Sequence, residues 1–154
     1  KAAIIHWAGY VWATTDVILS QYTLINVHPA DLTIMKDGHR QLAGPNGVGD
    51  ALSARADHIS SSAHIATPVL DDGPLLMVSP KIPVDYSLDL DEKDFMRHYL
   101  KQVNAQSRMI GARTIYEIAM GHFGLGDNGQ VYYMGEPIDQ GIRVEDWSKK
   151  KIKT

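Results

Sequence analysis

The stretch "LINVHPADL", residues 24–32, decides how this sequence is interpreted. An apolar run that ends at a proline predicts a short buried strand over residues 23–27. Asn26 and His28 are two residues apart, so on a strand both side chains point to the same face. An amide and an imidazole at the end of a buried strand are costly unless they are hydrogen-bonded or used. The pair therefore indicates either a functional site or an anchor for the following loop.

The residues before this strand predict a β-α-β unit. The run "AAIIHWA" (2–8), ended by Gly9, predicts a buried strand, and "TTDVILSQY" (14–22) predicts a helix with a threonine cap. Two strands joined by a helix run parallel, with a right-handed crossover. Ligands of α/β proteins bind at the carboxyl ends of such strands, which is where Asn26 and His28 lie.

The middle of the chain predicts a loop, a helix and two strands. Residues 36–49, "KDGHRQLAGPNGVG", are rich in glycine and polar residues and predict a loop. Residues 48–59 have the pattern of a modest helix. Two strands, 61–69 and 75–84, flank the turn "LDDGP" (70–74), in which Asp-Gly and proline break regular structure.

The last third predicts a long helix and a closing hairpin. Asp91 is an N-cap candidate with Asp94 three residues later, and apolar residues follow at helical spacing to about His122. We expect this helix to be interrupted near Gly111, because glycine disfavours helix. Residues 127–138, "DNGQVYYMGEPI", predict a turn, a strand and another turn.

Composition excludes several classes of function. The 154 residues fit one domain, and the net charge of −3 offers no basic field for nucleic acid. The absence of cysteine excludes disulfides and thiolate metal sites. No histidine pair has zinc-protease spacing, so we predict no metal site. No apolar run approaches the roughly 18 residues of a membrane span, and no signal peptide is visible, so we expect a cytoplasmic protein.

A second motif, farther along the chain, makes the first one more specific. "HIATPVLDDGP" (64–74) has a histidine, six residues, Asp71, one residue, and then Gly73-Pro74. Together with Asn26-Val-His28-Pro29, it resembles the formyltransferases that use 10-formyltetrahydrofolate, above all those of the glycinamide ribonucleotide transformylase type. Three more segments resemble this family: "WAGYVWATTDVIL", "GPNGVGDAL" and "DNGQVYYMGEPIDQG". The resemblance runs from about residue 2 to residue 142.

The resemblance implies an α/β domain over residues 1–154. The expected fold is a three-layer Rossmann-like formyltransferase fold, with a mostly parallel sheet and a closing hairpin. In the family, two further β-α units precede the strand at residues 2–8 and carry a phosphate-binding loop. We therefore expect a fragment, a short form, or a chain completed by another chain, and an open sheet edge that favours a homo-oligomer.

The resemblance also implies site residues. Asn26, His28 and Asp71 occupy the catalytic positions, where they would stabilise the oxyanion and move protons. The folate pocket would be formed by residues of two loops, although core packing remains the alternative for Trp12: Tyr10, Val11, Trp12, Ala13, Thr67, Pro68, Val69 and Leu70.

The implied reaction is transfer of a formyl group from 10-formyltetrahydrofolate to a small-molecule amine, in one-carbon metabolism and purine biosynthesis. Glycinamide ribonucleotide or another small amine is the expected acceptor, with no nucleic acid and no membrane as partner. The residues "ADL" after Pro29 replace a serine and an "LLP"-like run that is usual in the family, and Asn46 replaces a histidine, so the acceptor stays open. The alternatives are hydrolysis of 10-formyltetrahydrofolate and a non-catalytic folate-binding or assembly module.

Overall fold

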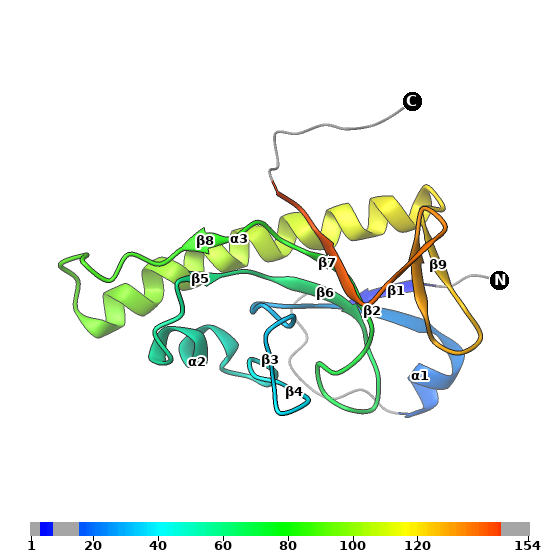
Figure 1. The fold of residues 1–154 in the computed structure, drawn as a ribbon, viewed down its shortest axis with the longest axis horizontal. Helices are drawn as coiled ribbons and strands as arrows, with labels where there is room; N and C mark the ends of the chain where they lie inside the picture. Colours follow the sequence, from blue (N-terminus) through cyan, green and yellow to red (C-terminus); the bar gives the residue numbers. More distant parts are fainter. Residues whose placement is uncertain (1–3, 8–15, 146–154) are drawn as a thin grey trace.

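The computed structural model describes residues 4–7 and 16–145, and its centre is a five-stranded sheet (Figure 1). The strands lie in the order β1 (Ile4–Trp7), β2 (Thr23–His28), β6 (Ser62–Ile65), β7 (Leu75–Val78) and β12 (Gln140–Arg143). The pairs β1–β2 and β7–β12 are parallel, whereas β6 is antiparallel to both β2 and β7. Four of these five strands therefore point the same way, and the sheet is mostly parallel, as predicted.

The predicted β-α-β order is confirmed, but the first strand is not buried as predicted, since Ile4 is 43% exposed and Ile5 and His6 are half-buried. Helix α1 (Asp16–Gln21) connects β1 to β2, and Trp7 pairs with Asn26 in the parallel register. The predicted threonine cap lies outside the described residues. Strand β1 is the first strand in the order, so it forms one edge of the sheet as described.

The long helix α3 (Glu92–Ala119) packs along β2, β6 and β7. It begins as predicted, because the Asp91 carboxylate accepts a hydrogen bond from the Asp94 backbone N–H at 2.8 Å. The predicted break near Gly111 is wrong, since the helix is continuous through that residue. A Cβ on Gly111 would lie 3.0 Å from His6 Nε2, so this glycine allows the helix to pass close to β1.

The predicted loop at residues 36–49 contains regular structure. Strands β3 (Met35–Lys36) and β4 (His39–Arg40) form a small hairpin, and Asp37 and Gly38 make its turn with φ values of 51° and 79°. Asp-Gly is typical of a two-residue turn that needs positive φ at both positions. Helix α2 (Gly47–Ser53) also begins within this range and ends earlier than predicted, before a strand that includes His58.

The remaining short strands were predicted only in part. Strand β5 (His58–Ile59) pairs with β8 (Ile82–Pro83), which is separate from β7 rather than its continuation. The predicted closing hairpin is confirmed as β10 (Val131–Tyr133) and β11 (Glu136–Ile138), and a third antiparallel strand, β9 (Phe123–Leu125), joins them. The prediction missed β9 and β12, and it placed the residues of β5 in a helix.

The alternation of β2 places its polar residues away from α3. Ile25 and Val27 pack in the same apolar cluster as Ile110 of α3. Successive side chains of a strand point to opposite faces, so Asn26 and His28 lie on the other face of the sheet.

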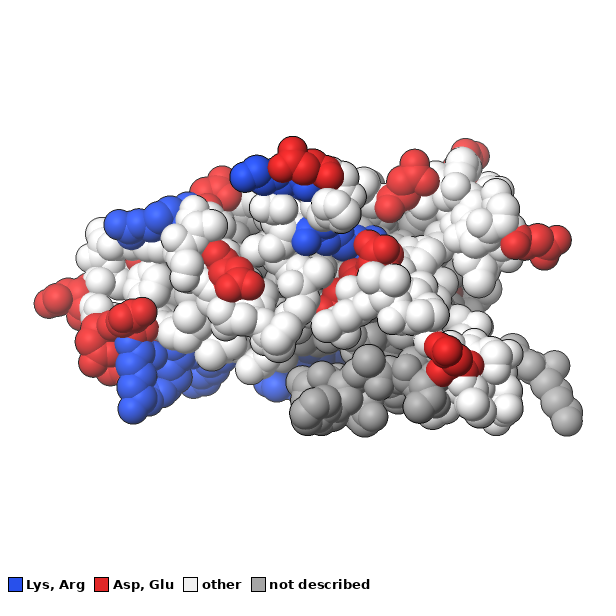
Figure 2. Space-filling view, turned by 90° about the horizontal axis from the view of Figure 1, so that it is seen from below, with Lys and Arg blue, Asp and Glu red and all other residues white. Residues whose placement is uncertain are grey.

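No helix in the described part of the chain is long and apolar enough to cross a membrane. Figure 2 shows that both acidic and basic side chains are distributed over the face in view.

Candidate active site

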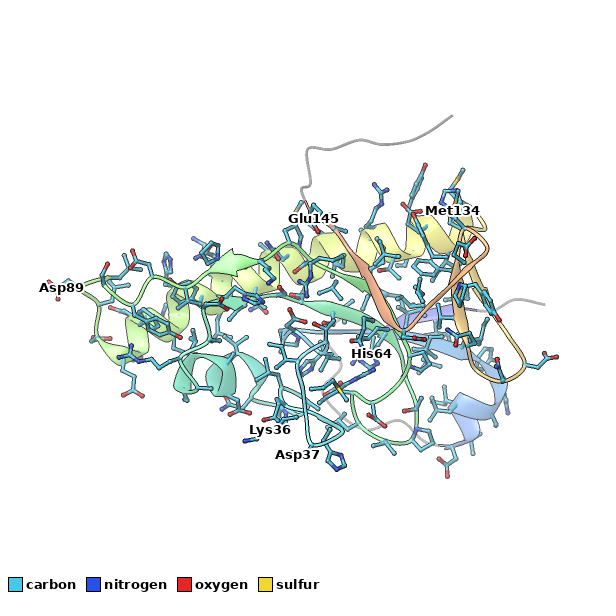
Figure 3. The ribbon with its side chains drawn as sticks, viewed as in Figure 1. Lys36, Asp37, His64, Asp89, Met134 and Glu145 are labelled. Carbon is cyan, nitrogen blue, oxygen red and sulfur yellow. The ribbon has the colours of Figure 1, made fainter. Side chains whose placement is uncertain are left out.

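The carboxyl end of β2 brings Asn26 next to a buried histidine. Asn26 is directly opposite His64 of β6 in the antiparallel register, so the two side chains share a face. Asn26 Nδ2 lies 3.3 Å from His64 Nε2, and the other ring nitrogen of His64 is 3.1 Å from the Ile65 carbonyl oxygen. Figure 3 shows His64 near the centre of the molecule, close to where the strands of the sheet meet.

The connection from β6 to β7 presents Asp71 to both histidines. Asp71 Oδ2 is 3.3 Å from His28 Nδ1, and Asp71 Oδ1 is 3.5 Å from His64 Nε2. The backbone of Asp71 is in the left-handed region, with a φ of 53°. Gly73 closes the connection tightly against β6, since a Cβ there would lie 1.7 Å from the Ile65 carbonyl oxygen. The Asp-x-Gly spacing therefore follows from the shape of this turn.

The segment 40–44, which begins at the last residue of β4, covers the His28–Asp71 pair. The Leu42 carbonyl accepts a hydrogen bond from His28 Nε2 at 2.7 Å, and the Gly44 N–H donates to Asp71 Oδ2 at 2.9 Å. Both ring nitrogens of His28 are thus engaged, one by Leu42 and the other by Asp71. A neutral ring that donates through Nε2 offers only a lone pair to Asp71, whereas a protonated ring donates to both partners.

Burial and charge act in opposite directions on this pair. Burial lowers the pKa of His28 below its ordinary value, although the nearby Asp71 carboxylate opposes the shift. Burial alone would raise the pKa of Asp71, but its contacts with His64, His28 and the Gly44 N–H outweigh that effect and lower it. Asp71 is therefore held as a carboxylate, and His28 holds its extra proton less tightly than a free imidazole does.

The predicted site residues lie in three places. Asn26, His28 and Asp71 come together as described above, and His64 links Asn26 to Asp71. Four predicted pocket residues lie outside the described part of the chain: Tyr10, Val11, Trp12 and Ala13. The other four, Thr67, Pro68, Val69 and Leu70, form the loop directly before Asp71, where the Val69 and Leu70 side chains are 62% and 48% exposed.

Two contributions to this arrangement were absent from the predicted site. His64 belongs to the motif quoted above but was given no function, although the antiparallel pairing of the two motif strands would have placed it opposite Asn26. Arg40 lies in the range predicted as a loop, and its guanidinium donates to the Asp71 carbonyl oxygen at 2.5 Å. Among the described residues, no group of histidine and carboxylate side chains could hold a metal ion.

An ion pair between buried Asp31 and half-buried Arg143 fixes the chain directly after the site. Asp31, which is 1% exposed, accepts a hydrogen bond from Arg143 Nη2 of β12 at 2.7 Å and another from the Thr33 hydroxyl at 2.5 Å. Burial alone would raise the pKa of Asp31, but Thr33 and Arg143 outweigh it and lower the pKa. The pair connects the loop after Pro29 to the last strand of the sheet.

Solved structures with the same fold include enzymes of formyl-group chemistry. Phosphoribosylglycinamide formyltransferase from Coxiella burnetii, in complex with CHES, matches with a TM-score of 0.73 and 23% identity over 91% of this chain and 60% of that one. The corresponding protein of Anaplasma phagocytophilum gives a TM-score of 0.66 and 21% identity over 92% and 63%. A formyltetrahydrofolate deformylase from Pseudomonas syringae pv. tomato gives 0.57 and 16% over 71% and 32%.

No protein-family model and no curated protein sequence matches the chain. The structural matches establish the fold: this is an α/β chain with the Rossmann-like formyltransferase fold. The chain spans 60% and 63% of the length of the first two solved structures.

Proposed function

We propose that this chain is an enzyme that transfers the formyl group of 10-formyltetrahydrofolate to an amine. The observation that carries the proposal is the convergence of Asn26, His28 and Asp71 on one face of the sheet, at the carboxyl end of β2. Polar groups at this position of an α/β sheet are placed where ligands bind. The formyltransferase fold and the two sequence motifs support the same chemistry.

The three side chains can perform the steps that this reaction needs. When an amine attacks the formyl carbon, the formyl oxygen becomes an oxyanion. The Asn26 amide nitrogen lies 3.3 Å from His64 Nε2, and an N–H of this amide is the group that we assign to the oxyanion. His28 then takes up the proton that the amine loses, with Asp71 orienting the ring and stabilising its charge. The proton is finally returned to the departing folate nitrogen.

This mechanism requires a rearrangement at His28. Nε2 is hydrogen-bonded to the Leu42 carbonyl oxygen at 2.7 Å, and Nδ1 faces Asp71. Contact between His28 and the substrate therefore exchanges the Leu42 hydrogen bond for one to the reacting group. We infer that the His28 ring shifts away from the Leu42 carbonyl when the substrates bind, while Arg40 and Gly44 keep their contacts with Asp71.

The acceptor and the folate site belong to the proposal as well. We assign folate binding to the loop Thr67–Leu70 together with residues 10–13, as the family resemblance implies. A small amine such as glycinamide ribonucleotide is the proposed acceptor, within a single catalytic domain acting in cytoplasmic purine biosynthesis. A second copy, or a chain that covers the outer edge of β1, would complete the sheet in this proposal.

One assay separates the candidate functions. The protein is incubated with 10-formyltetrahydrofolate alone, with glycinamide ribonucleotide, and with other small amines, and release of tetrahydrofolate is followed. Release that depends on an amine supports transfer, whereas release without any amine supports hydrolysis, the reaction named for the Pseudomonas syringae structure. Binding of the folate without any release, measured by calorimetry, would contradict the enzyme proposal and support a folate-binding module.

A further inference from the structure

The backbone and side chains of residues 40–44 contact the His28–Asp71 pair at every second residue. Arg40 donates to the Asp71 carbonyl oxygen, Leu42 accepts from His28 Nε2, and the Gly44 N–H donates to Asp71 Oδ2, at 2.5, 2.7 and 2.9 Å. The last two contacts are made by the backbone and do not depend on the side chain. The contact of Arg40 is the side-chain contribution of this segment to the site.

Arg40 is held where it can fix the backbone of Asp71. Its side chain is half-buried, and burial lowers its pKa, opposed by the charges of Asp72 and Asp71. Asp71 has a φ of 53°, a left-handed conformation that a residue other than glycine keeps where its surroundings hold it. A guanidinium bonded to the carbonyl of that residue stabilises the strained conformation directly.

We propose that Arg40 is a positioning residue of the active site: from strand β4, it holds the Asp71 backbone in the left-handed conformation that directs the carboxylate toward His28. The inference rests on the proposed function for its catalytic consequence, but the geometry can be tested without any reaction. It also gives the β3–β4 hairpin a function, because the hairpin delivers this guanidinium. Lys36 and Asp37, which Figure 3 shows at the far end of the hairpin, make no contact with Asp71 that the structure records.

The kinetic test compares Arg40→Gln with Lys36→Gln. Both substitutions remove one positive charge from the same hairpin, but only the first removes the contact to Asp71. We expect Arg40→Gln to lower kcat by at least about 10-fold, since misplacement of a catalytic group by about 1 Å can cost 100-fold. The KM for the folate should change less than about threefold, and Lys36→Gln should leave both constants unchanged.

A second measurement reports the position of Asp71 without activity. The Gly44 amide donates to the Asp71 carboxylate, so its hydrogen exchange depends on where that carboxylate lies. In Arg40→Gln we expect protection of the Gly44 amide to fall at least about 10-fold, with a smaller fall in Arg40→Lys, which retains a cation. Lys36→Gln should match the wild type. If the wild type has no formyl chemistry but this protection falls, the proposed function fails and the positioning inference stands.

The titration of His28 gives a third readout. Three charged or titratable groups face this ring: Asp71, His64 and Arg40. Because the Arg40 charge opposes protonation of the ring, its loss should raise the midpoint of the His28 titration in NMR spectra. Unchanged kcat, Gly44 protection and His28 midpoint in both Arg40 variants, folded as the wild type, would overturn the inference.

Discussion

At the scale of single residues, the sequence predicted the orientation of His28 but not its hydrogen-bond partners. The spacing of Asn26 and His28 predicted that both point to one face, and the alternation of β2 against α3 bears this out. The sequence could not reveal that both nitrogens of His28 are engaged, because one partner is a backbone carbonyl in a segment predicted to be a loop. A backbone acceptor leaves no mark on residue type, so no pattern could have identified Leu42.

The first prediction concerns His28 itself. His28→Ala should reduce turnover by at least about 100-fold, because it removes both a proton carrier and the partner of Asp71. Folate affinity should change little, since the pocket is formed by other residues. Steady-state kinetics of formyl release measure the effect, and His39→Ala, an exposed histidine of β4, serves as the control. Unchanged turnover in His28→Ala would remove this residue from the mechanism.

A second residue-scale prediction concerns the ion pair of Asp31 and Arg143. Arg143→Met leaves the Asp31 carboxylate buried without its cation, and we expect the free energy of unfolding to fall by about 3 kcal/mol. The double variant Asp31→Leu with Arg143→Met removes both charges and should recover most of that loss. Urea unfolding measures both values. A single variant as stable as the wild type would show that the pair contributes nothing.

At the scale of elements, helices and turns were predicted correctly where residues with strong backbone preferences mark their ends. The Asp91 cap, the helix after it and strand β10 between its turns were predicted because cap and turn residues have strong local preferences. The pairing of β10 with β11 was implied only by the family resemblance. The β3–β4 hairpin was missed although Asp-Gly is present, because its strands are only two residues long and carry no alternating pattern. Strand β12 was missed because its partner β7 lies about 65 residues earlier in the chain, beyond any local pattern.

The N-cap of α3 gives the element-scale prediction. Asp91→Ala removes the acceptor for the Asp94 N–H and should lower the free energy of unfolding by about 1 kcal/mol. Asp89→Ala, which removes an exposed carboxylate two residues earlier, should stay within about 0.5 kcal/mol of the wild type. Thermal or urea unfolding of the two variants makes the comparison. Equal stability of both would mean that the cap does not stabilise this helix.

At the scale of the whole molecule, the buried titratable groups make stability depend on pH. Asp31, Asp71 and Glu117 have lowered pKa values, although burial alone would raise each, because hydrogen bonds and cations outweigh it. The pKa of His28 is lowered by burial from 6.5. In all four cases the unfolded chain binds protons at a higher pH than the folded chain does, so stability falls as the pH falls.

We therefore expect the loss of stability in two windows. The first begins near pH 6.5, where an unfolded His28 protonates, and the second begins near pH 4.5, where the unfolded carboxylates protonate. Urea unfolding at about pH 7, 5 and 3 should show both losses, and His28→Asn should abolish most of the first. Stability that rises as the pH falls from 7 to 5 would contradict the assignment of His28 as a group whose protonation is opposed by burial.

In the proposed mechanism Asn26, His28 and Asp71 act together on a formyl group. A crystal structure with a non-reactive analogue of 10-formyltetrahydrofolate would show whether they do. We predict that the analogue's formyl oxygen lies within hydrogen-bond distance of Asn26 Nδ2, and that His28 Nε2 has left the Leu42 carbonyl to face the formyl group. An analogue bound away from Asn26, with the hydrogen bond from His28 to Leu42 intact, would contradict the account.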